Sequence, residues 1–185
     1  MLTAKQQQNK PLISITDGKK LGEIKDLYLD QGLKSVAAVF LGTEGLVRRK
    51  SLVLDRAAIQ VLGTDAWLVA DSDRVTELST LAEANTLVLI GELKGRAIET
   101  EGGTKIGTVE DVILDENAYV VGFTFGRVHV QGPLAERKTI SRVAIKNVGS
   151  KDSPMTTILA RAEEFLIPDA QPQVQSETVV EQPQG

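Results

Sequence analysis

Four aspartates form two pairs in which the members lie four residues apart, and this spacing could do chemistry. They are Asp26 and Asp30 in LGEIKDLYLD (21–30), and Asp111 and Asp115 in IGTVEDVILD (106–115). Paired carboxylates can bind a metal ion or share a proton. In a regular strand, however, residues four apart are separated by roughly 14 Å, which is too far for either role. We therefore expect the first aspartate of each pair to fix a bend in a strand and the second to begin a turn.

His129 and the glycine-rich GGTKIG at 102–107 are further candidates for chemistry. A single histidine in a chain without cysteine cannot form a typical zinc site unless carboxylates join it, so we expect an ordinary surface or rim histidine. GGTKIG lacks the spacing of a phosphate-binding loop and matches DGKKLG at 17–22, which predicts a hairpin in both places. The sequence therefore predicts no catalytic residue, no metal site and no cofactor, and we expect the protein not to be an enzyme.

Two short basic clusters are the candidates for binding a partner. They are Arg48, Arg49 and Lys50 in VRRK, and Arg137 and Lys138 in ERK. Arginine can hold phosphate or carboxylate groups through two parallel hydrogen bonds, so these residues could contact an acidic protein, RNA or lipid headgroups. Alternatively, they are solvated charges that protect strand edges from pairing with other chains. Both interpretations remain open at this point.

The elements that must position these residues occur in two copies along the chain. Besides the two ten-residue segments above, VAAVFLG at 36–42 matches VVGFTFG at 120–126. Later, DRAAIQVLG at 55–63 matches SRVAIKNVG at 141–149. Because these features follow one another in the same order in both copies, the sequence predicts an internal duplication.

Short apolar segments separated by turns containing Gly, Asp and Asn predict a mainly β fold. One expected strand is LVRRKSLVL at 46–54. Regularly spaced short strands favour a small closed or nearly closed barrel in each copy, because closure hides the sheet edges. The segment at 71–84 predicts a short helix or an extended arm lying across the barrels. Trp67 is expected to pack inside a barrel or between domains.

Composition gives the domain organisation and the cellular setting. The chain has 185 residues, a formal net charge of −4 and no cysteine, so it lacks disulfides and a strong positive field. It shows no secretory signal and no apolar run of membrane-spanning length, so we expect a cytoplasmic protein, with peripheral membrane association as the alternative. The expected units are a flexible N-terminus (1–10), a first barrel (11–71), a short helical connector (72–92), a second barrel (93–167) and a disordered tail (168–185).

The repeated pattern resembles the PRC-barrel family. A strand-opening glycine, an IGxVxD core ending in a second Asp, an apolar strand after a turn and a later segment ending in Gly carry the resemblance, first over residues 11–71 and again over residues 94–151. The family includes the cytoplasmic barrel of the photosynthetic reaction-centre H subunit and the C-terminal domain of the ribosome maturation factor RimM. The membrane helix of the former and the preceding β-domain of the latter have no counterpart here.

The resemblance implies a non-catalytic module of two PRC barrels that binds a protein partner of unknown identity, for example during assembly of a larger complex. One alternative is an RNA- or ribosome-associated maturation factor. Another is a peripheral factor of photosynthetic complexes at a membrane. Association into a homo-oligomer is also left open, because units of about 80 residues are near the lower limit for an independently stable core.

Overall fold

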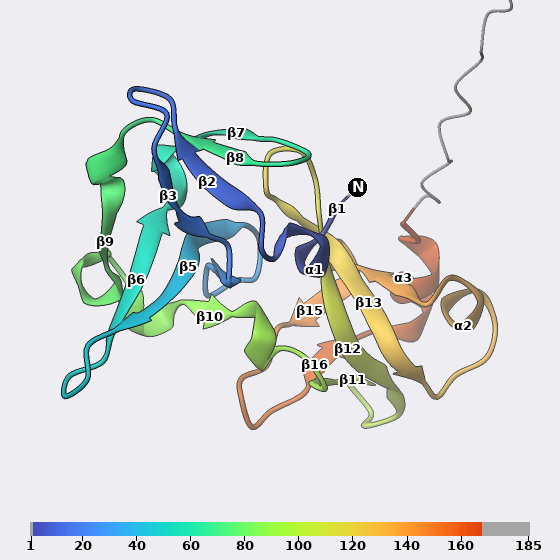
Figure 1. Cartoon of the computed structure of the whole chain (residues 1–185). Coiled ribbons are helices and arrows are strands. Elements are labelled where there is room, and N and C mark those ends of the chain that lie inside the picture. Colours follow the sequence, from blue (N-terminus) through green and yellow to red (C-terminus); the bar gives the residue numbers. More distant parts are fainter. Residues whose placement is uncertain (1, 168–185) are drawn as a thin grey trace, which may run out of the picture.

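The computed structural model describes residues 2–167, so the tail expected at 168–185 lies outside the described residues. The protein is mainly β, and Figure 1 shows two β-rich units side by side, joined by a winding connector. We call residues 11–71 the first unit and residues 93–167 the second unit.

The first unit contains two separate sheets. The five-stranded sheet has the order β10-β4-β5-β6-β9, and the four-stranded sheet has the order β3-β2-β8-β7, in which β2 and β8 are parallel. The strands of the unit itself are β2 (Pro11–Ser14), β3 (Lys20–Glu23), β4 (Asp26–Leu29), β5 (Val36–Glu44), β6 (Lys50–Asp55), β7 (Ile59–Leu62) and β8 (Trp67–Val69), with a 3₁₀ turn, η1 (Arg56–Ala58), after β6.

The second unit forms one sheet of order β14-β13-β12-β11-β16-β15, in which β11 and β16 are parallel. Its α-helices, α2 and α3, lie at the side of the molecule away from the first unit (Figure 1). Its elements are β11 (Ala97–Thr100), β12 (Lys105–Leu114), β13 (Val120–Val128), α2 (Pro133–Arg137), β14 (Thr139–Ser141), η6 (Arg142–Ala144), β15 (Ile145–Asn147), β16 (Met155–Thr157) and α3 (Leu159–Glu164).

The expected closed barrels are not confirmed, because no sheet among residues 2–167 closes on itself. The two units differ at the bend that the sequence placed near Asp26. In the first unit the chain leaves the strand at residues 24–25, which separates β3 from β4. In the second unit β12 continues through the matching position with shifts in register around Val109 and Asp111. The break between β3 and β4 leaves the first unit with two sheets. The continuous, bent strand β12 leaves the second unit with one sheet.

The connector, expected at 72–92 as a short helix or an extended arm, contains no α-helix but combines short 3₁₀ helices with extended segments. It consists of 3₁₀ turns and two strands: η2 (Ser72–Arg74), β9 (Val75–Glu77), η3 (Leu78–Thr80), η4 (Ala84–Thr86), β10 (Val88–Leu89) and η5 (Ile90–Glu92). Strand β9 pairs with β6, and β10 pairs with β4. The two strands therefore pair with backbone groups at open sheet edges, which a helix would have left unpaired because its own backbone groups bond to each other.

The N-terminal segment was expected to be flexible, and the structure corrects this as well. Strand β1 (Leu2–Thr3) pairs with β12 of the second unit, and helix α1 (Ala4–Gln7) follows directly. Ala4 and Gln7 are buried. A polar sequence becomes ordered here because its backbone extends a sheet edge and its few apolar atoms complete a core.

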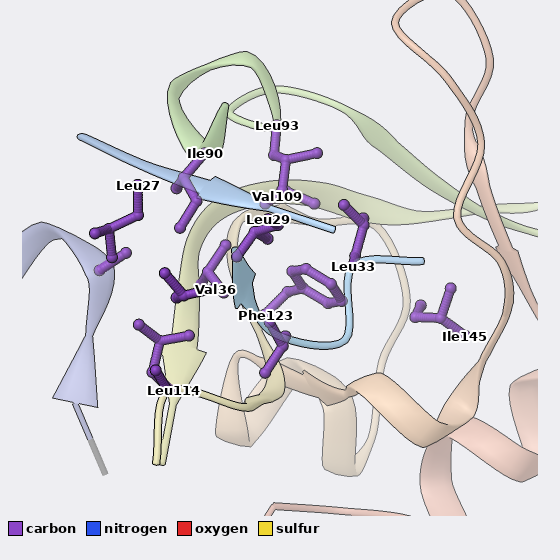
Figure 2. Close-up of a cluster of buried hydrophobic side chains, with 14 of the residues drawn as sticks. Leu27, Leu29, Leu33, Val36, Ile90, Leu93, Val109, Leu114, Phe123 and Ile145 are labelled. Carbon is purple, nitrogen blue, oxygen red and sulfur yellow. The ribbon is translucent and has the colours of Figure 1, made fainter. Parts of the chain in front are cut away.

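A continuous hydrophobic core joins the two units. Figure 2 shows its central side chains, which come from both units and from the connector. The first unit contributes Leu27, Leu29, Leu33 and Val36, the second contributes Leu93, Val109, Leu114, Phe123 and Ile145, and the connector contributes Ile90. Most of these side chains are leucine, isoleucine or valine. Because residues of both units belong to the same cluster of contacts, the units pack against each other as parts of one core.

One expected strand is shorter than the sequence suggested. Strand β6 begins at Lys50, whereas the sequence predicted a strand from residue 46. Strand β5 continues to Glu44, which lies opposite Lys50 in the hairpin, so residues 45–49 form the turn. Gly45 enters that turn with a φ of 97°, a conformation that glycine adopts without strain. The two aliphatic residues that follow therefore leave the strand.

Candidate functional site

The first aspartate of each pair binds the backbone amide of the next residue and an amide in the segment ahead of the opposite unit. The Asp26 carboxylate accepts hydrogen bonds from the Leu27 amide at 2.8 Å and from the Gly91 amide at 2.9 Å. The Asp111 carboxylate accepts from the Val112 amide at 2.8 Å, and from the Lys5 amide at 3.2 and 3.3 Å. Each aspartate thus holds the segment that precedes the opposite unit.

Strand pairing repeats this reciprocal pattern. Strand β1, ahead of the first unit, pairs with β12 of the second unit, and β10, ahead of the second unit, pairs with β4 of the first. Between them, Ser35 and Tyr119 form an isolated antiparallel bridge. The amide of Val36 donates to the Ala118 carbonyl at 2.9 Å, and the amide of Val120 donates to the Lys34 carbonyl at 2.8 Å. The contacts are arranged as in a dimer with an approximate two-fold axis.

Two matched arginines also cross between the units. Arg142 donates from Nε to the carbonyls of Gly32 at 3.1 Å and Leu33 at 3.0 Å, and Nη2 also donates to Gly32. Arg56 donates from Nη2 to the Asn117 carbonyl at 3.1 Å. Desolvation lowers the pKa of the Arg142 guanidinium, with Asp30 opposing the shift. Sequence reasoning did not identify these residues, although the shared Arg in DRAAI and SRVAI was a signal.

The second aspartate of each pair begins a turn, as predicted. Asp30 accepts from the Ser35 amide at 2.6 Å and from the Lys34 amide at 3.2 Å. Asp115 accepts from the amides of Asn117 and Tyr119, both at 2.8 Å. These carboxylates hold the turns whose residues form the bridge between the units, so their role in the structure is positional.

Asp26 has a perturbed pKa. Burial raises it above its ordinary value, and the negative charges of Asp111 and Glu92 raise it further, while the amides of Leu27 and Gly91 oppose the shift. A raised carboxyl pKa in a cleft can mark an acid–base residue. Here both amide partners lie in the contact between the units, so the geometry accounts for the burial without invoking a reaction.

His129 and the glycine-rich segment at 102–107 were the remaining candidates for chemistry. His129 is exposed, and its backbone amide donates to the Ile106 carbonyl at 2.8 Å. Residues 101–104, which include the start of the glycine-rich segment, form the turn between β11 and β12, and Gly103 has a φ of 83° there. Among residues 2–167, no group of three or more His, Cys, Asp or Glu side chains could hold a metal ion.

Trp67 is fully buried, as expected. Its indole N–H donates to Oε1 of Gln7 at 3.3 Å, and the same oxygen accepts from the Lys10 ammonium at 2.8 Å. Gln7 is itself buried. The N-terminal segment therefore supplies the polar partner that a buried indole requires, so Trp67 is unavailable as a surface anchor.

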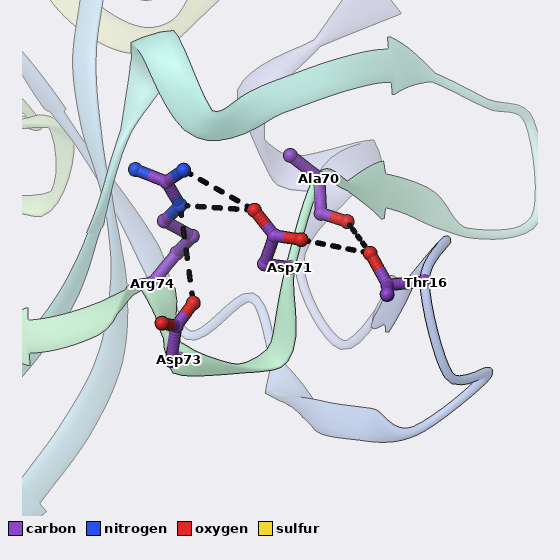
Figure 3. A network of polar contacts seen from close by, with 5 residues as sticks. All are labelled: Thr16, Ala70, Asp71, Asp73 and Arg74. Carbon is purple, nitrogen blue, oxygen red and sulfur yellow. Dashed lines mark hydrogen bonds and ion pairs between the residues drawn. The ribbon is translucent and has the colours of Figure 1, made fainter.

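A polar network holds the boundary of the first unit (Figure 3). The Thr16 hydroxyl contacts the Ala70 carbonyl at 2.7 Å and the Asp71 carboxylate at 2.8 Å, and Arg74 donates to the same carboxylate at 3.2 and 3.3 Å. Hydrogen bonds from Thr16 and Arg74 lower the pKa of Asp71. Arg74 also lines a groove of about 690 Å³, and its charge there is already engaged by Asp71 and Asp73.

The basic residues nominated from the sequence lie in two separate places. Arg48, Arg49 and Lys50 are exposed at the end of the β5–β6 hairpin, whereas Arg137 and Lys138 lie at the end of α2. Figure 1 shows the hairpin turn and α2 at opposite ends of the molecule. Lys50 forms an ion pair with Glu77 of β9, and Arg137 donates to the Ile167 carbonyl at 2.9 Å. The structure therefore does not combine the clusters into one site.

The hairpin turn also carries residues that sequence reasoning missed. Leu46 and Val47 have relative exposures of 104% and 97%, while the other exposed large hydrophobics lie between 41% and 58%. Their position between Gly45 and the two arginines was the available signal. Together with Arg48 and Arg49 they form the most distinctive surface feature of the first unit, and we call residues 45–49 the hairpin tip.

Comparison with known proteins identifies the class of one unit. Residues 85–151 match the family model of the PRC-barrel domain, a segment that begins in η4 and ends after β15. The chain therefore contains a PRC-barrel domain, and the match covers most of the second unit without reaching the first. No curated protein matches the chain. None of the helices within residues 2–167 has the length and apolar character needed to span a membrane.

Proposed function

We propose that the protein is a non-catalytic assembly module in which two PRC-type units act as one rigid scaffold for a protein partner. The observation that carries the proposal is the reciprocal contact between the units. Asp26 and Asp111 each bind the segment ahead of the opposite unit, and Ser35 and Tyr119 bridge the units. A scaffold that joins other molecules benefits from a fixed spacing between its binding surfaces. If the two units moved freely, the entropy lost in fixing them on binding would lower the affinity.

The proposal treats residues 11–71 as a second PRC-type unit. It is supported by the shared order of elements and by matching hydrogen bonds, such as those from Gly95 to Val109 and from Asn9 to Ile24. It also treats the protein as lacking catalysis. In support, the paired aspartates bind backbone amides at the bends and turns, where they have structural work to do.

The proposed partner is a protein that contacts exposed surfaces of both units. On the second unit, we propose that Lys138 and Arg137, which were nominated from the sequence, contact acidic groups of this partner. Assembly with photosynthetic complexes remains a prediction of the family resemblance alone, while a location in the cytoplasm and formation of homo-oligomers remain predictions from the sequence.

The experiment is crosslinking mass spectrometry in the source cell, with a photoreactive residue introduced at position 138 of the full-length chain. We expect repeated crosslinks to one protein complex. The matched variant is Asp26→Ala/Asp111→Ala, which loosens the contact between the units and leaves the surface near Lys138 unchanged. Loss of the crosslinks in this variant supports a rigid two-unit scaffold. Crosslinks that merely follow cellular protein abundance would refute the proposal.

RNA binding is a second candidate, favoured by one observation. Arg48 and Arg49 make no hydrogen bond or ion pair with other residues of the described chain, so both guanidinium groups are available to phosphates. The overall charge of −4 and an aromatic content of 4% oppose it, because single-stranded RNA is usually held by positive grooves and stacked rings. Salt-dependent RNA binding that Arg48→Ala/Arg49→Ala abolishes would favour RNA, and no binding at low salt would eliminate it.

A further inference from the structure

The hairpin tip exposes two aliphatic side chains more completely than any other large hydrophobic residues described. Leu46 and Val47 have exposures of 104% and 97%. Isolated exposed apolar residues are common on protein surfaces and need no explanation. Two adjacent ones that contact almost no protein atoms, at the end of a projecting hairpin, retain their full hydrophobic free energy for another surface (Figure 1).

The architecture shared by the two units does not require this exposure. In the second unit the corresponding connection, residues 129–138 between β13 and β14, contains α2. Leu134 of that helix is fully buried, and the helix contacts α3. The second unit therefore covers the apolar residue of its connection, whereas the first unit presents two to solvent.

The tip is held in a defined shape. Gly45 has a φ of 97°, and a Cβ at this position would meet the Arg48 carbonyl oxygen at 2.2 Å. Only glycine fits there. The strands on both sides remain paired up to Glu44 and Lys50. The aliphatic pair is therefore presented without the entropic cost of ordering a long flexible loop.

Positive charge lies directly behind the aliphatic pair. Arg48 and Arg49 have no ion-pair partner among the described residues, while the Lys50 ammonium is paired with Glu77. Glu44 is also exposed nearby, so three basic side chains face two acidic ones around the tip. The local charge is thus positive in a protein whose formal net charge is −4.

We propose that the hairpin tip binds the surface of an anionic lipid bilayer, with Leu46 and Val47 entering the interface and Arg48 and Arg49 contacting the headgroups. A bilayer accepts a convex aliphatic tip without needing a shaped socket. A protein interface needs about 1,000 Å² to be stable, which five residues cannot supply alone. Leu and Val are also under-represented among the residues that dominate protein interfaces.

The contact is reversible and salt-sensitive. Two short aliphatic side chains contribute less than one fatty acyl chain, which itself gives only marginal binding unless a basic patch assists it. The overall negative charge repels an anionic surface, so binding depends on orientation of the tip toward the bilayer. This proposal does not depend on the scaffold function, because it concerns a segment outside the contact between the units.

The test measures co-sedimentation of the full-length protein with vesicles at low salt. One set contains equal parts of phosphatidylglycerol and phosphatidylcholine, and the other contains phosphatidylcholine alone. We expect binding to the anionic set only. Arg48→Ala/Arg49→Ala should lower the partition coefficient by about 30-fold, at ~1 kcal/mol for each charge near the surface. Leu46→Asp/Val47→Asp should lower it by roughly 100-fold.

Matched controls change the same charges elsewhere on the protein. Lys105→Ala/Arg127→Ala removes two exposed basic side chains of the second unit, and Ile15→Asp/Val143→Asp adds two carboxylates at partly exposed apolar positions. We expect both controls to retain most of the binding, with only the small loss that two net charges cause at a distance. Equal losses in tip variants and controls would overturn the proposal, because the tip would then have no special role.

A spectroscopic measurement reports insertion directly. In Leu46→Trp, the introduced indole should be quenched by brominated acyl chains in anionic vesicles, while Trp67 serves as an unquenched reference because it is fully buried. Absence of quenching with bound protein would refute insertion. Failure of the wild-type protein to bind anionic vesicles would also overturn the proposal, as would equal binding to neutral vesicles or tip-dependent binding to an acidic protein in place of lipid.

Discussion

Replacing Arg142 by alanine tests whether the contacts between the units hold the fold together. Arg142 directs two donor nitrogens to carbonyls of the first unit, at Gly32 and Leu33, and a third nitrogen donates to the Ile145 carbonyl of its own unit at 3.2 Å. Its removal leaves these partly buried carbonyls without their charged donor. A hydrogen bond to a charged group contributes about 1.5 kcal/mol or more to stability.

Arg56 is the matched control, because it occupies the corresponding position in the first unit. Its Nη1 donates to the Ile59 carbonyl at 3.1 Å, which mirrors the local bond of Arg142, but only Nη2 crosses to the other unit. With three donor nitrogens engaged in Arg142 and two in Arg56, we expect Arg142→Ala to cost about 4.5 kcal/mol and Arg56→Ala about 3 kcal/mol. The expected difference is about 1.5 kcal/mol.

Urea unfolding of the full-length variants, followed by circular dichroism, measures both free energies. In thermal unfolding of the same variants, a chain of this size should show a melting temperature about 5 °C lower for Arg142→Ala than for Arg56→Ala. Arg142→Lys should recover less than half of the loss, because an ammonium cannot reproduce the planar arrangement of donors. Equal losses at the two positions, or a larger loss at Arg56, would refute the assigned role of the crossing donors.

Further predictions concern the carboxylate at the contact, the shared core and one close backbone approach. Because burial raises the folded-state pKa of Asp26 above 3.8, the wild type should lose stability relative to Asp26→Asn as pH rises through the range above that value, and a gap independent of pH in urea titrations would contradict this. Phe123→Ala should cost about 3–5 kcal/mol and shift the unfolding transition reported by Trp67 fluorescence as much as that reported by circular dichroism, whereas an unchanged Trp67 transition would mean that the units unfold separately. Gly107→Ala should destabilise the protein clearly, since a Cβ there would meet a carbonyl oxygen of β13 at 2.4 Å, while Gly102→Ala, with its nearest neighbour at 3.8 Å, should be nearly neutral in the same assay.

The turns and bends of the fold could be predicted from sequence because local chemistry determines them. Asp30 and Asp115 begin turns through bonds to amides a few residues later, which a short segment encodes by itself. The exchange of β1 and β10 between units could not be predicted. Each is a strand of two residues, and its partner is chosen by the distant sheet edge that is left open.

The candidate surface was only partly accessible to sequence reasoning. The basic residues of the hairpin were identified by type, but type alone could not separate Arg48 from Arg137, which donates to the Ile167 carbonyl. Leu46 and Val47 are aliphatic residues that precede the apolar residues 52–54 in one short segment, so the sequence placed them in the same strand. Their exposure follows from where Gly45 begins the turn, and that depends on how far β5 extends beside β6.

The repeated residues and the unrepeated ones therefore have different meanings. Matched positions such as Asp26 and Asp111, or Arg56 and Arg142, make equivalent contacts to the opposite unit or to the segment ahead of it, and an approximately two-fold contact requires the same residue types on both sides. Their repetition is explained by packing. The hairpin tip has no such partner in the second unit, where α2 occupies the corresponding connection. Because packing leaves Leu46 and Val47 unexplained, the function specific to this chain should be sought there first.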